Sequence, residues 1–166
     1  MKPLTRRQLR IALIYASLGL ALVVTAIVWG DPPVWEIWVP FAVTFVALEF
    51  SAVEVNDRLF QSSGVMVATT AGTYFALHPD ASAFTAMVLM AALGPFVIED
   101  FRQRRWFQPT ANFGQMVITA GISGLILDAL LSDAGAIASS RLPLVALAGS
   151  LGSGLYSLIN TMMVRI

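Results

Sequence analysis

The sequence predicts an all-α membrane protein, a compact bundle of six transmembrane helices with both termini on the cytoplasmic side. The 166 residues are 57% hydrophobic and 12% charged, with a mean hydropathy of +0.76, so the chain is far more apolar than an average globular protein. Its charged residues separate apolar stretches that are each about as long as a helix crossing ~30 Å of hydrocarbon. Basic residues also concentrate in alternate gaps between these stretches.

This alternation predicts the orientation in the membrane. Arg141 alone falls on one side, and the other nine basic residues fall on the opposite side: Lys2, Arg6, Arg7, Arg10, Arg58, Arg102, Arg104, Arg105 and Arg165. Basic residues near the ends of spans are retained in the cytoplasm. We therefore expect a multi-pass protein of the cell (inner) membrane whose N-terminus and C-terminus are both inside.

The expected spans fill the chain as one domain and leave no room for a soluble one. They cover about 10–29, 37–53, 63–78, 83–99, 109–131 and 143–164. The first apolar run is longer than that of a usual secretory signal, and Trp29-Gly30-Asp31-Pro32-Pro33 follows it without a small-x-small cleavage site. We therefore interpret it as an uncleaved span.

The next elements are justified by their boundaries. Trp29, Trp35 and Trp38 are expected as interfacial anchors around the first outer loop. The second span has Pro40 in its first turn and leads into an amphipathic inner connection, Glu54–Ser63. The third span ends at the outer loop His78-Pro79-Asp80, and the fourth has Gly94-Pro95 near its inner end as a kink or a close contact.

Small residues at helical spacing predict which faces of the helices pack together, because apolar helices have no hydrophobic drive to associate in lipid. The first span has Ala12–Ala16 and Ser17–Ala21, and the fifth, which begins near Pro109, has Gly121 and Gly124. After an Ala/Gly/Ser-rich outer loop, the sixth span carries a similar set: Gly149, Gly152, Ser153 and Gly154. The pattern is typical of a compact bundle.

Polar side chains inside the spans are the candidate site residues, since charges are costly in the membrane. Glu49 is expected in a buried hydrogen bond or an ion pair with Arg58, Arg102 or Arg105, or alternatively in a ligand or ion site. Asp128 lies toward the outer end of its span, where it would snorkel or face a cavity. The amides of Asn112 and Gln115, one helical turn apart, and of Asn160 suit either cross-helix hydrogen bonds or a neutral heterocyclic ligand.

Several classes of function are excluded by what the sequence lacks. It has no cysteine and a single histidine, His78, so it offers no thiolate and no His/Cys metal cluster, and we expect no cofactor. The residue patterns of intramembrane proteases are missing, which argues against an enzyme. A net charge of zero gives no signal for a nucleic-acid partner.

The segment GPFVIEDFRQRRWFQPTANFGQMVITAGISGLI carries a family resemblance. A Gly-Pro at the inner end of a span, a short basic loop and then Asn-Phe-x-Gln resemble vitamin-uptake-like membrane sensor domains. Such domains precede HD-type or GGDEF-type signalling domains in bacteria and are related to the S components of energy-coupling factor transporters. The closing-span sequence Leu155–Asn160 is similar too. The resemblance implies a six-helix fold with a pocket open to the outside.

Three functional hypotheses follow. The first is a non-enzymatic domain that binds a small molecule from the outer side and signals, by helix rearrangement, to a cytoplasmic signalling domain. The second is the substrate-capture subunit of a micronutrient transporter, with a transmembrane partner subunit. The third is a structural subunit of a larger membrane complex. The sensor version implies a domain after Ile166, so the chain is expected to be either part of a sensor or a free-standing subunit.

Overall fold

The computed structural model describes residues 6–50, 53–56, 59–61, 64–94 and 107–131, together with residues 147, 149–151, 154 and 158 of the last part of the chain. The described chain is predominantly α-helical, as expected. Its elements are α1 (Arg6–Trp29), α2 (Trp35–Phe50), β1 (Val53–Asn56), β2 (Leu59–Gln61), α3 (Gly64–Ala76), α4 (Ala83–Ala91) and α6 (Phe107–Leu131).

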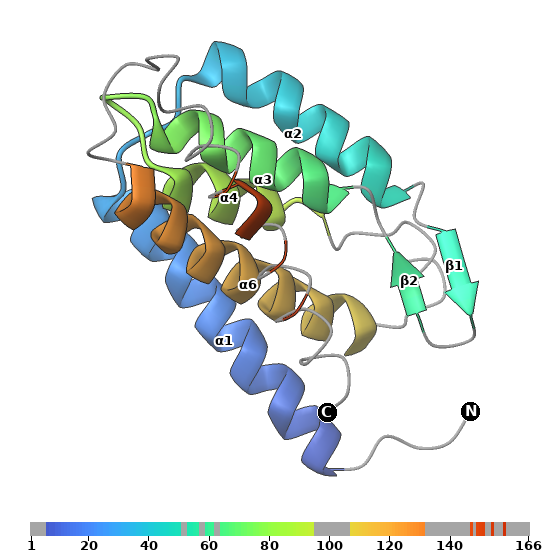
Figure 1. Ribbon diagram of the computed structural model, residues 1–166. Coiled ribbons are helices and arrows are strands. Elements are labelled where there is room, and N and C mark those ends of the chain that lie inside the picture. The colour runs from blue at the N-terminus through green and yellow to red at the C-terminus, as the bar shows by residue number, and fades with distance from the viewer. Residues whose placement is uncertain are drawn as a thin grey trace.

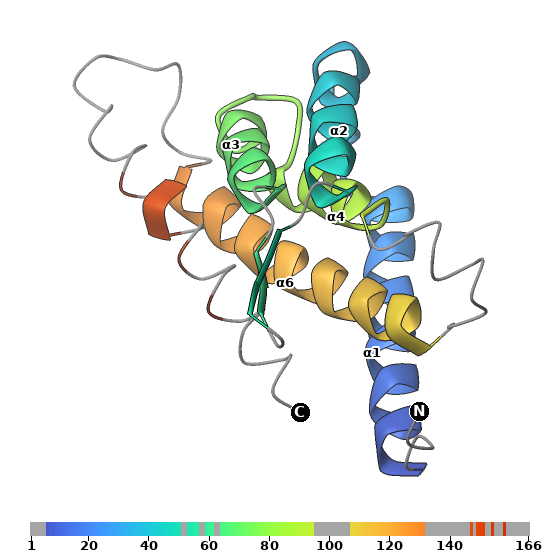
Figure 2. The ribbon, with the colours of Figure 1, turned by 90° about the vertical axis from the view of Figure 1, so that its right-hand side faces the viewer.

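The helix α6 is the central element of the bundle (Figure 1). It packs against α1 on one side and against α4 and α3 on the other, and α2 is added to the outside of α3. Figure 2 shows the same order from a second direction, with α6 crossing α1 and with α2 and α3 standing side by side. This order places α2 far from α1 and makes α3 and α4 the layer between α2 and α6.

Glycines allow the close crossing of α1 and α6. A Cβ on Gly114 of α6 would overlap the backbone of Tyr15 and lie 2.6 Å from the nitrogen of Ala16, and a Cβ on Gly19 would lie 2.9 Å from the Cα of Gly114. Ala12 on α1 is buried on this same face. Without side chains at the crossing, the two backbones approach closely enough for dispersion to hold them in an apolar medium.

The core lies where α2, α3, α4 and α6 converge. Phe45, Phe75 and Met87 are fully buried, and the position of Gly72 on α3 is covered by Met87 and by Leu127, whose Cδ1 would lie 2.9 Å from a Cβ at that position. The indole N–H of Trp38 donates to the carbonyl of Ala86 in α4 at 2.9 Å. This bond ties α2 to the core. Trp38 is therefore buried, and the prediction that it is an interfacial anchor is wrong, whereas Trp29 and Trp35 are exposed.

One of the two small-residue pairs expected to pack on α1 does not lie on its packing face. Ala12, Gly19 and Ala26 are buried, whereas Ser17 and Ala21 face outward. A spacing of seven residues returns to the same face of a helix, and Ala12, Gly19 and Ala26 follow that spacing toward α6. Spacing alone does not distinguish this face from the equally regular face that carries Ser17 and Ala21.

Several elements end earlier than the expected spans. The helix α4 stops at Ala91 and a turn follows over 92–94, before Pro95, which disfavours helical geometry at the residue that precedes it. A Cβ on Gly94 would lie only 2.7 Å from Met116 Cε. The close contact expected at Gly94 is therefore confirmed. The connection after α2 holds a short antiparallel hairpin, with Glu54 opposite Phe60. Alternating Val53-Glu54-Val55-Asn56 favours a strand of this kind.

Among the described residues, two helices are long and apolar enough to cross a membrane: Arg6–Trp29 and the part of α6 from Pro109 to Leu131. At 1.5 Å per residue, α1 is about 36 Å long, whereas α2, α3 and α4 reach only about 24, 20 and 14 Å. Of the sixth expected span, residues 147, 149–151, 154 and 158 are helical and the remainder lies outside the described residues.

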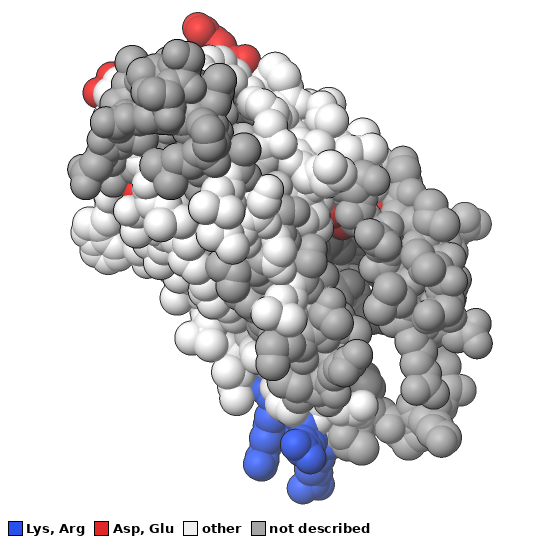
Figure 3. All heavy atoms as spheres, viewed as in Figure 1, with Lys and Arg blue, Asp and Glu red and all other residues white. Residues whose placement is uncertain are grey.

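Charge separates along the bundle. The Arg side chains of the described residues gather at the first turns of α1, and Figure 3 shows Asp and Glu side chains at the opposite end. Asp31, Glu36 and Asp80 are exposed in the connections and first turn found there. We call these the basic end and the acidic end. Large apolar side chains are exposed between them, among them Leu13, Ile14, Leu18, Ile27 and Val43.

We expect Gly114→Ala to destabilise the protein far more than Gly121→Ala. A methyl group at Gly114 would overlap the α1 backbone, whereas at Gly121 the nearest side-chain atoms lie 3.4 Å away, near normal contact. Overpacking of this kind costs about 1–3 kcal/mol. Thermal unfolding in mild detergent measures the difference, and equal melting temperatures for the two variants would show that the α1–α6 crossing is looser than described.

Candidate functional site

Asp128, near the end of α6, closes the N-terminus of α4. Its Oδ1 accepts a hydrogen bond from the backbone N–H of Ala83 at 2.8 Å. Its Oδ2 accepts from the Ser82 hydroxyl at 2.7 Å and from the N–H of Phe84 at 3.0 Å. Ser82 is the N-cap of α4, and its hydroxyl oxygen accepts from the N–H of Thr85 at 3.3 Å. Together the two side chains serve the first three N–H groups of the helix.

This arrangement explains why a carboxylate is placed here. The first N–H groups of a helix have no intrahelical partner, and an anion is favoured at the positive end of the helix dipole. Gly124 lets the start of α4 rest directly on α6, since a Cβ there would lie 2.6 Å from the Cα of Phe84. Asp128 is thereby engaged by three donors and half-buried, which assigns it a role in holding two helices together.

A row of buried polar side chains runs along α6 between Asp128 and the basic end. Gln115, Thr119 and Ser123 follow one another at four-residue spacing and are all buried. Gln115 and Thr119 both have interaction partners. The hydroxyl oxygens of Ser123 and Thr85 are buried without a hydrogen-bond partner in the part of the chain that the structure describes. Thr85 lies against Gly30 at the end of α1.

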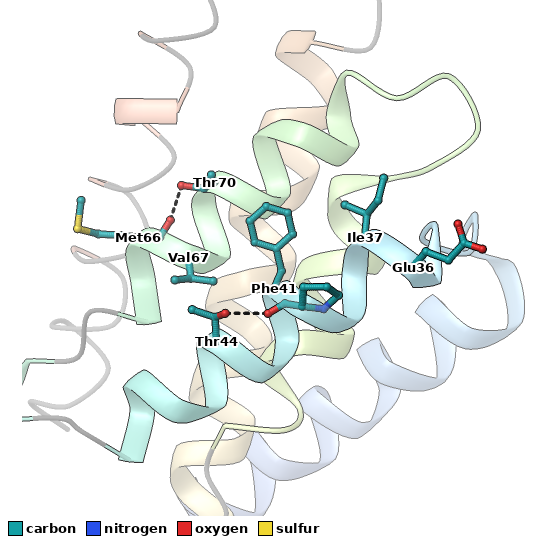
Figure 4. A pocket seen from close by; sticks show the side chains of 8 residues that line it. Glu36, Ile37, Phe41, Thr44, Met66, Val67 and Thr70 are labelled. Atoms are coloured by element: carbon teal, nitrogen blue, oxygen red, sulfur yellow. Dashed lines mark hydrogen bonds between the residues drawn. The ribbon is translucent and has the colours of Figure 1, made fainter.

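An open groove of about 550 Å³ lies between α2 and α3 (Figure 4). From α2 it is lined by Glu36, Ile37, Pro40, Phe41 and Thr44, and from α3 by Met66, Val67 and Thr70. Phe41 points into the space between the two helices, and Glu36 lies at the acidic end of the groove. A second open hollow of about 480 Å³, on another face of α2, is lined by Trp38, Val39, Ala42, Val43, Val46, Ala47 and Leu93.

Aromatic rings adjoin the α2–α3 groove toward the acidic end. Tyr74 is the centre of this cluster, with ring centroids 6.5 Å from Phe41, 5.3 Å from Phe75 and 6.2 Å from His78. His78 is a turn residue, as expected of a histidine before proline, and its Nδ1 accepts from the N–H of Asp80 at 3.4 Å. The rings form one wall at the end of the bundle that the sequence places outside.

The structure does not bring the predicted site residues together. Asp128 lies thirteen residues, or about 20 Å, along α6 from Gln115. Phe45 of α2 and Met116 of α6 both contact Gly94, so Glu49 and Asn112, each about one turn nearer the basic end, share a depth. Glu49 is half-buried and has an interaction partner, Asn112 is exposed and Gln115 is buried. Asn160 lies outside the described residues.

Two features of the site are missed by the sequence analysis although each has a local signal. Ser82 comes directly before the apolar run of α4, which is a common N-cap position. Pro40 removes an N–H inside α2 and exposes a carbonyl one turn earlier, at Glu36. Asp128, the partner of Ser82, and α3, which lies beside Glu36 and Pro40 across the groove, are remote in sequence, so no local pattern indicates them. Within the described ranges no group of three metal-ligating side chains occurs.

Comparison of the chain with models of known families, with curated proteins and with solved structures yields no match.

We expect Asp128→Ala to lower the free energy of unfolding by about 1–3 kcal/mol, because it leaves the N–H groups of Ala83 and Phe84 without their acceptor. Asp80→Ala, which removes an exposed carboxylate two residues from Ser82, is the matched control and should change stability by less than about 0.5 kcal/mol. Combined with Ser82→Ala, the loss should be less than additive, since the two side chains share one network. Unfolding in detergent tests this, and strict additivity would contradict the network.

Proposed function

We propose that this chain is a six-span, non-enzymatic membrane domain that binds a small molecule from the outer side and signals its binding to a cytoplasmic output. The groove between α2 and α3 carries the proposal. The groove extends from the acidic end, at Glu36 of α2, to Met66 near the start of α3, its volume is within the range of about 300–1,000 Å³ of small-molecule sites, and its walls are mostly apolar.

Membrane insertion with both termini inside is supported by the surface of the bundle. The exposed apolar side chains of α1 would face lipid, and the Arg cluster at the start of α1 would stay in the cytoplasm. The helices α2, α3 and α4 are shorter than the ~30 Å of hydrocarbon that a span crosses, and α3 and α4 pack against α6. A soluble protein would have to leave this whole surface in water.

The signalling step is a shift between two helix arrangements, which requires the ligand to bind one of them more tightly. The α2–α3 pair suits this step, because among the described residues α2 packs mainly on α3 and is tied to α4 by the Trp38–Ala86 bond, whereas α1 and α6 pack closely on each other. A molecule in the groove would therefore change the position of α2 more readily than that of α6. The inner loop Glu99–Arg105 and the last span would transmit the change.

A structural subunit of a larger complex is the second candidate, and Asp128 favours it. The carboxylate of Asp128, a predicted site residue, bonds to the start of α4 and so holds two helices together. The glycines of α6 likewise serve helix packing. A transporter capture subunit would share the groove and differ in its partner. Neighbouring ATPase genes would favour the transporter, and an open reading frame continuing past Ile166 into a soluble domain would favour the sensor.

Cysteine accessibility tests the proposed orientation, because the chain contains no cysteine of its own. In intact spheroplasts, a membrane-impermeant maleimide should label Asp31→Cys and Asp80→Cys. It should label Gln8→Cys and Gln103→Cys only after permeabilisation. Labelling of Gln8→Cys in sealed spheroplasts would place the N-terminus outside and overturn the orientation.

Native mass spectrometry of the purified chain tests ligand binding. We expect one adduct of constant mass in preparations from different detergents, and we expect Thr70→Trp, which fills the groove from α3, to remove it. Val43→Trp on another face of α2 is the matched control and should retain it. Loss of the adduct in Glu49→Ala or Asn112→Ala instead would move the site to the basic half. Detergent and phospholipid adducts alone would favour the structural role.

A further inference from the structure

The α2–α3 groove has one polar end, and the hydroxyl groups along its walls are already used. The hydroxyl of Thr44 donates to the carbonyl of Pro40 at 2.8 Å, and that of Thr70 donates to the carbonyl of Met66 at 2.7 Å. Each hydroxyl has a single hydrogen, so neither has a donor left for a ligand. Ile37, Phe41 and Val67 add apolar surface (Figure 4). The middle of the groove therefore suits a hydrocarbon chain better than a polar heterocycle.

The acidic end of the groove offers two hydrogen-bond acceptors on the same residue. One is the exposed carboxylate of Glu36. The other is the Glu36 backbone carbonyl, whose usual helical partner would be the N–H of residue 40, and Pro40 has none. The described lining residues thus offer two acceptors and have no side-chain donor left. A ligand group that only donates hydrogen bonds fits this end of the groove best. An ammonium group has three donors and no acceptor.

The local charge has the sign that an ammonium group requires. The N-terminus of α2 contributes about half a positive charge, which the full negative charge of Glu36 exceeds. Asp31, in the connection that precedes α2, adds a second negative charge at the same end. The exposed ring of Trp35 is typical of the membrane–water boundary, where a charged head group stays hydrated while its chain enters the apolar region.

We propose that the α2–α3 groove binds an alkyl amine of medium chain length, with the alkyl chain along Phe41 and Val67 and the ammonium group at Glu36. This inference rests on the proposed ligand-binding function and names the ligand class. Five residues of α2 line the groove, and from Glu36 to Thr44 they extend over about 12 Å of helix. This length accommodates one medium-length alkyl chain. The second hollow on α2, lined only by apolar residues, lacks a polar end and has no preference for a charged head group.

Photolabelling tests the inference. The full chain is reconstituted in phosphatidylcholine vesicles and irradiated with dodecylamine that carries a diazirine in its alkyl chain, and labelled peptides are identified by mass spectrometry. We expect label on the α2 and α3 peptides that contain Phe41 and Val67. Unlabelled dodecylamine should compete, and dodecanol and dodecanoate of the same length should compete less well. Thr70→Trp should abolish this label, and Val43→Trp should not.

The charge of Glu36 is tested by Glu36→Gln, which keeps the size of the side chain and leaves the groove open. An exposed ion pair of this kind corresponds to a roughly two- to fivefold change in affinity, so we expect the concentration of dodecylamine for half-maximal competition to rise by about that factor. The value for dodecanol should not change. Thermal unfolding of Glu36→Gln, compared with that of the unmodified chain, checks that the variant is folded.

Two results would overturn the inference, and only one of them would also count against the proposed ligand-binding function. Equal competition by amine, alcohol and acid, unchanged in Glu36→Gln but abolished in Thr70→Trp, would show a groove that binds alkyl chains without selecting the head group. The proposed ligand-binding function would then survive. Label spread over α1 and α6 and unaffected by Thr70→Trp would show no site in the groove, and it would count against both proposals.

Discussion

The carboxylate of Asp128 joins the end of α6 to the start of α4, and the positions of the other helices follow from this junction. In an apolar medium, each N–H group without an acceptor costs several kcal/mol. A helix that begins inside the bundle, as α4 does at Ala83, therefore needs acceptors from elsewhere in the chain. Asp128 and Ser82 provide them, and Gly124 lets α4 come close enough to use them. The helix α3 then packs on α4, and α2 packs on α3.

The other half of α6 is held by a different interaction. At Gly114 the backbones of α6 and α1 are in direct contact. One central helix is thus joined by a polar cap near one end and by close apolar packing toward the other. The two longest helices form a rigid pair, whereas α2 lies at the outside with a groove beside it. The proposed sensing mechanism uses this contrast, because a molecule bound in the groove would contact α2, which lies at the outside of the bundle, and not the α1–α6 pair.

The polar residues of the chain illustrate how side chains that are costly to bury find partners on other helices. The sequence predicts that Asp128 snorkels or faces a cavity, and it instead completes a helix terminus. Trp38 is predicted at the membrane boundary, and its indole N–H instead bonds to the carbonyl of Ala86 inside the core. In the sequence, Glu36 is one acidic residue beside a loop and no pattern marks it as a site residue. It becomes the polar end of a groove because α3 lies next to α2. In each case the side chain takes its role from a partner on another helix.

The helical class, the apolar character of the surface and the separation of charge between the two ends can all be predicted from the sequence, because they depend on composition and on the order of residues along single helices. The same is true of the close contact at Gly94 and of the small residues of α6. Four features emerge only from the packed bundle. They are the packing face of α1, the end of α4, the hairpin after α2 and the groups that bond to Asp128. Most of these features depend on contacts between residues some 40 to 100 positions apart, such as Ser82 with Asp128 or Tyr15 with Gly114, and helical periodicity carries no information about the partner.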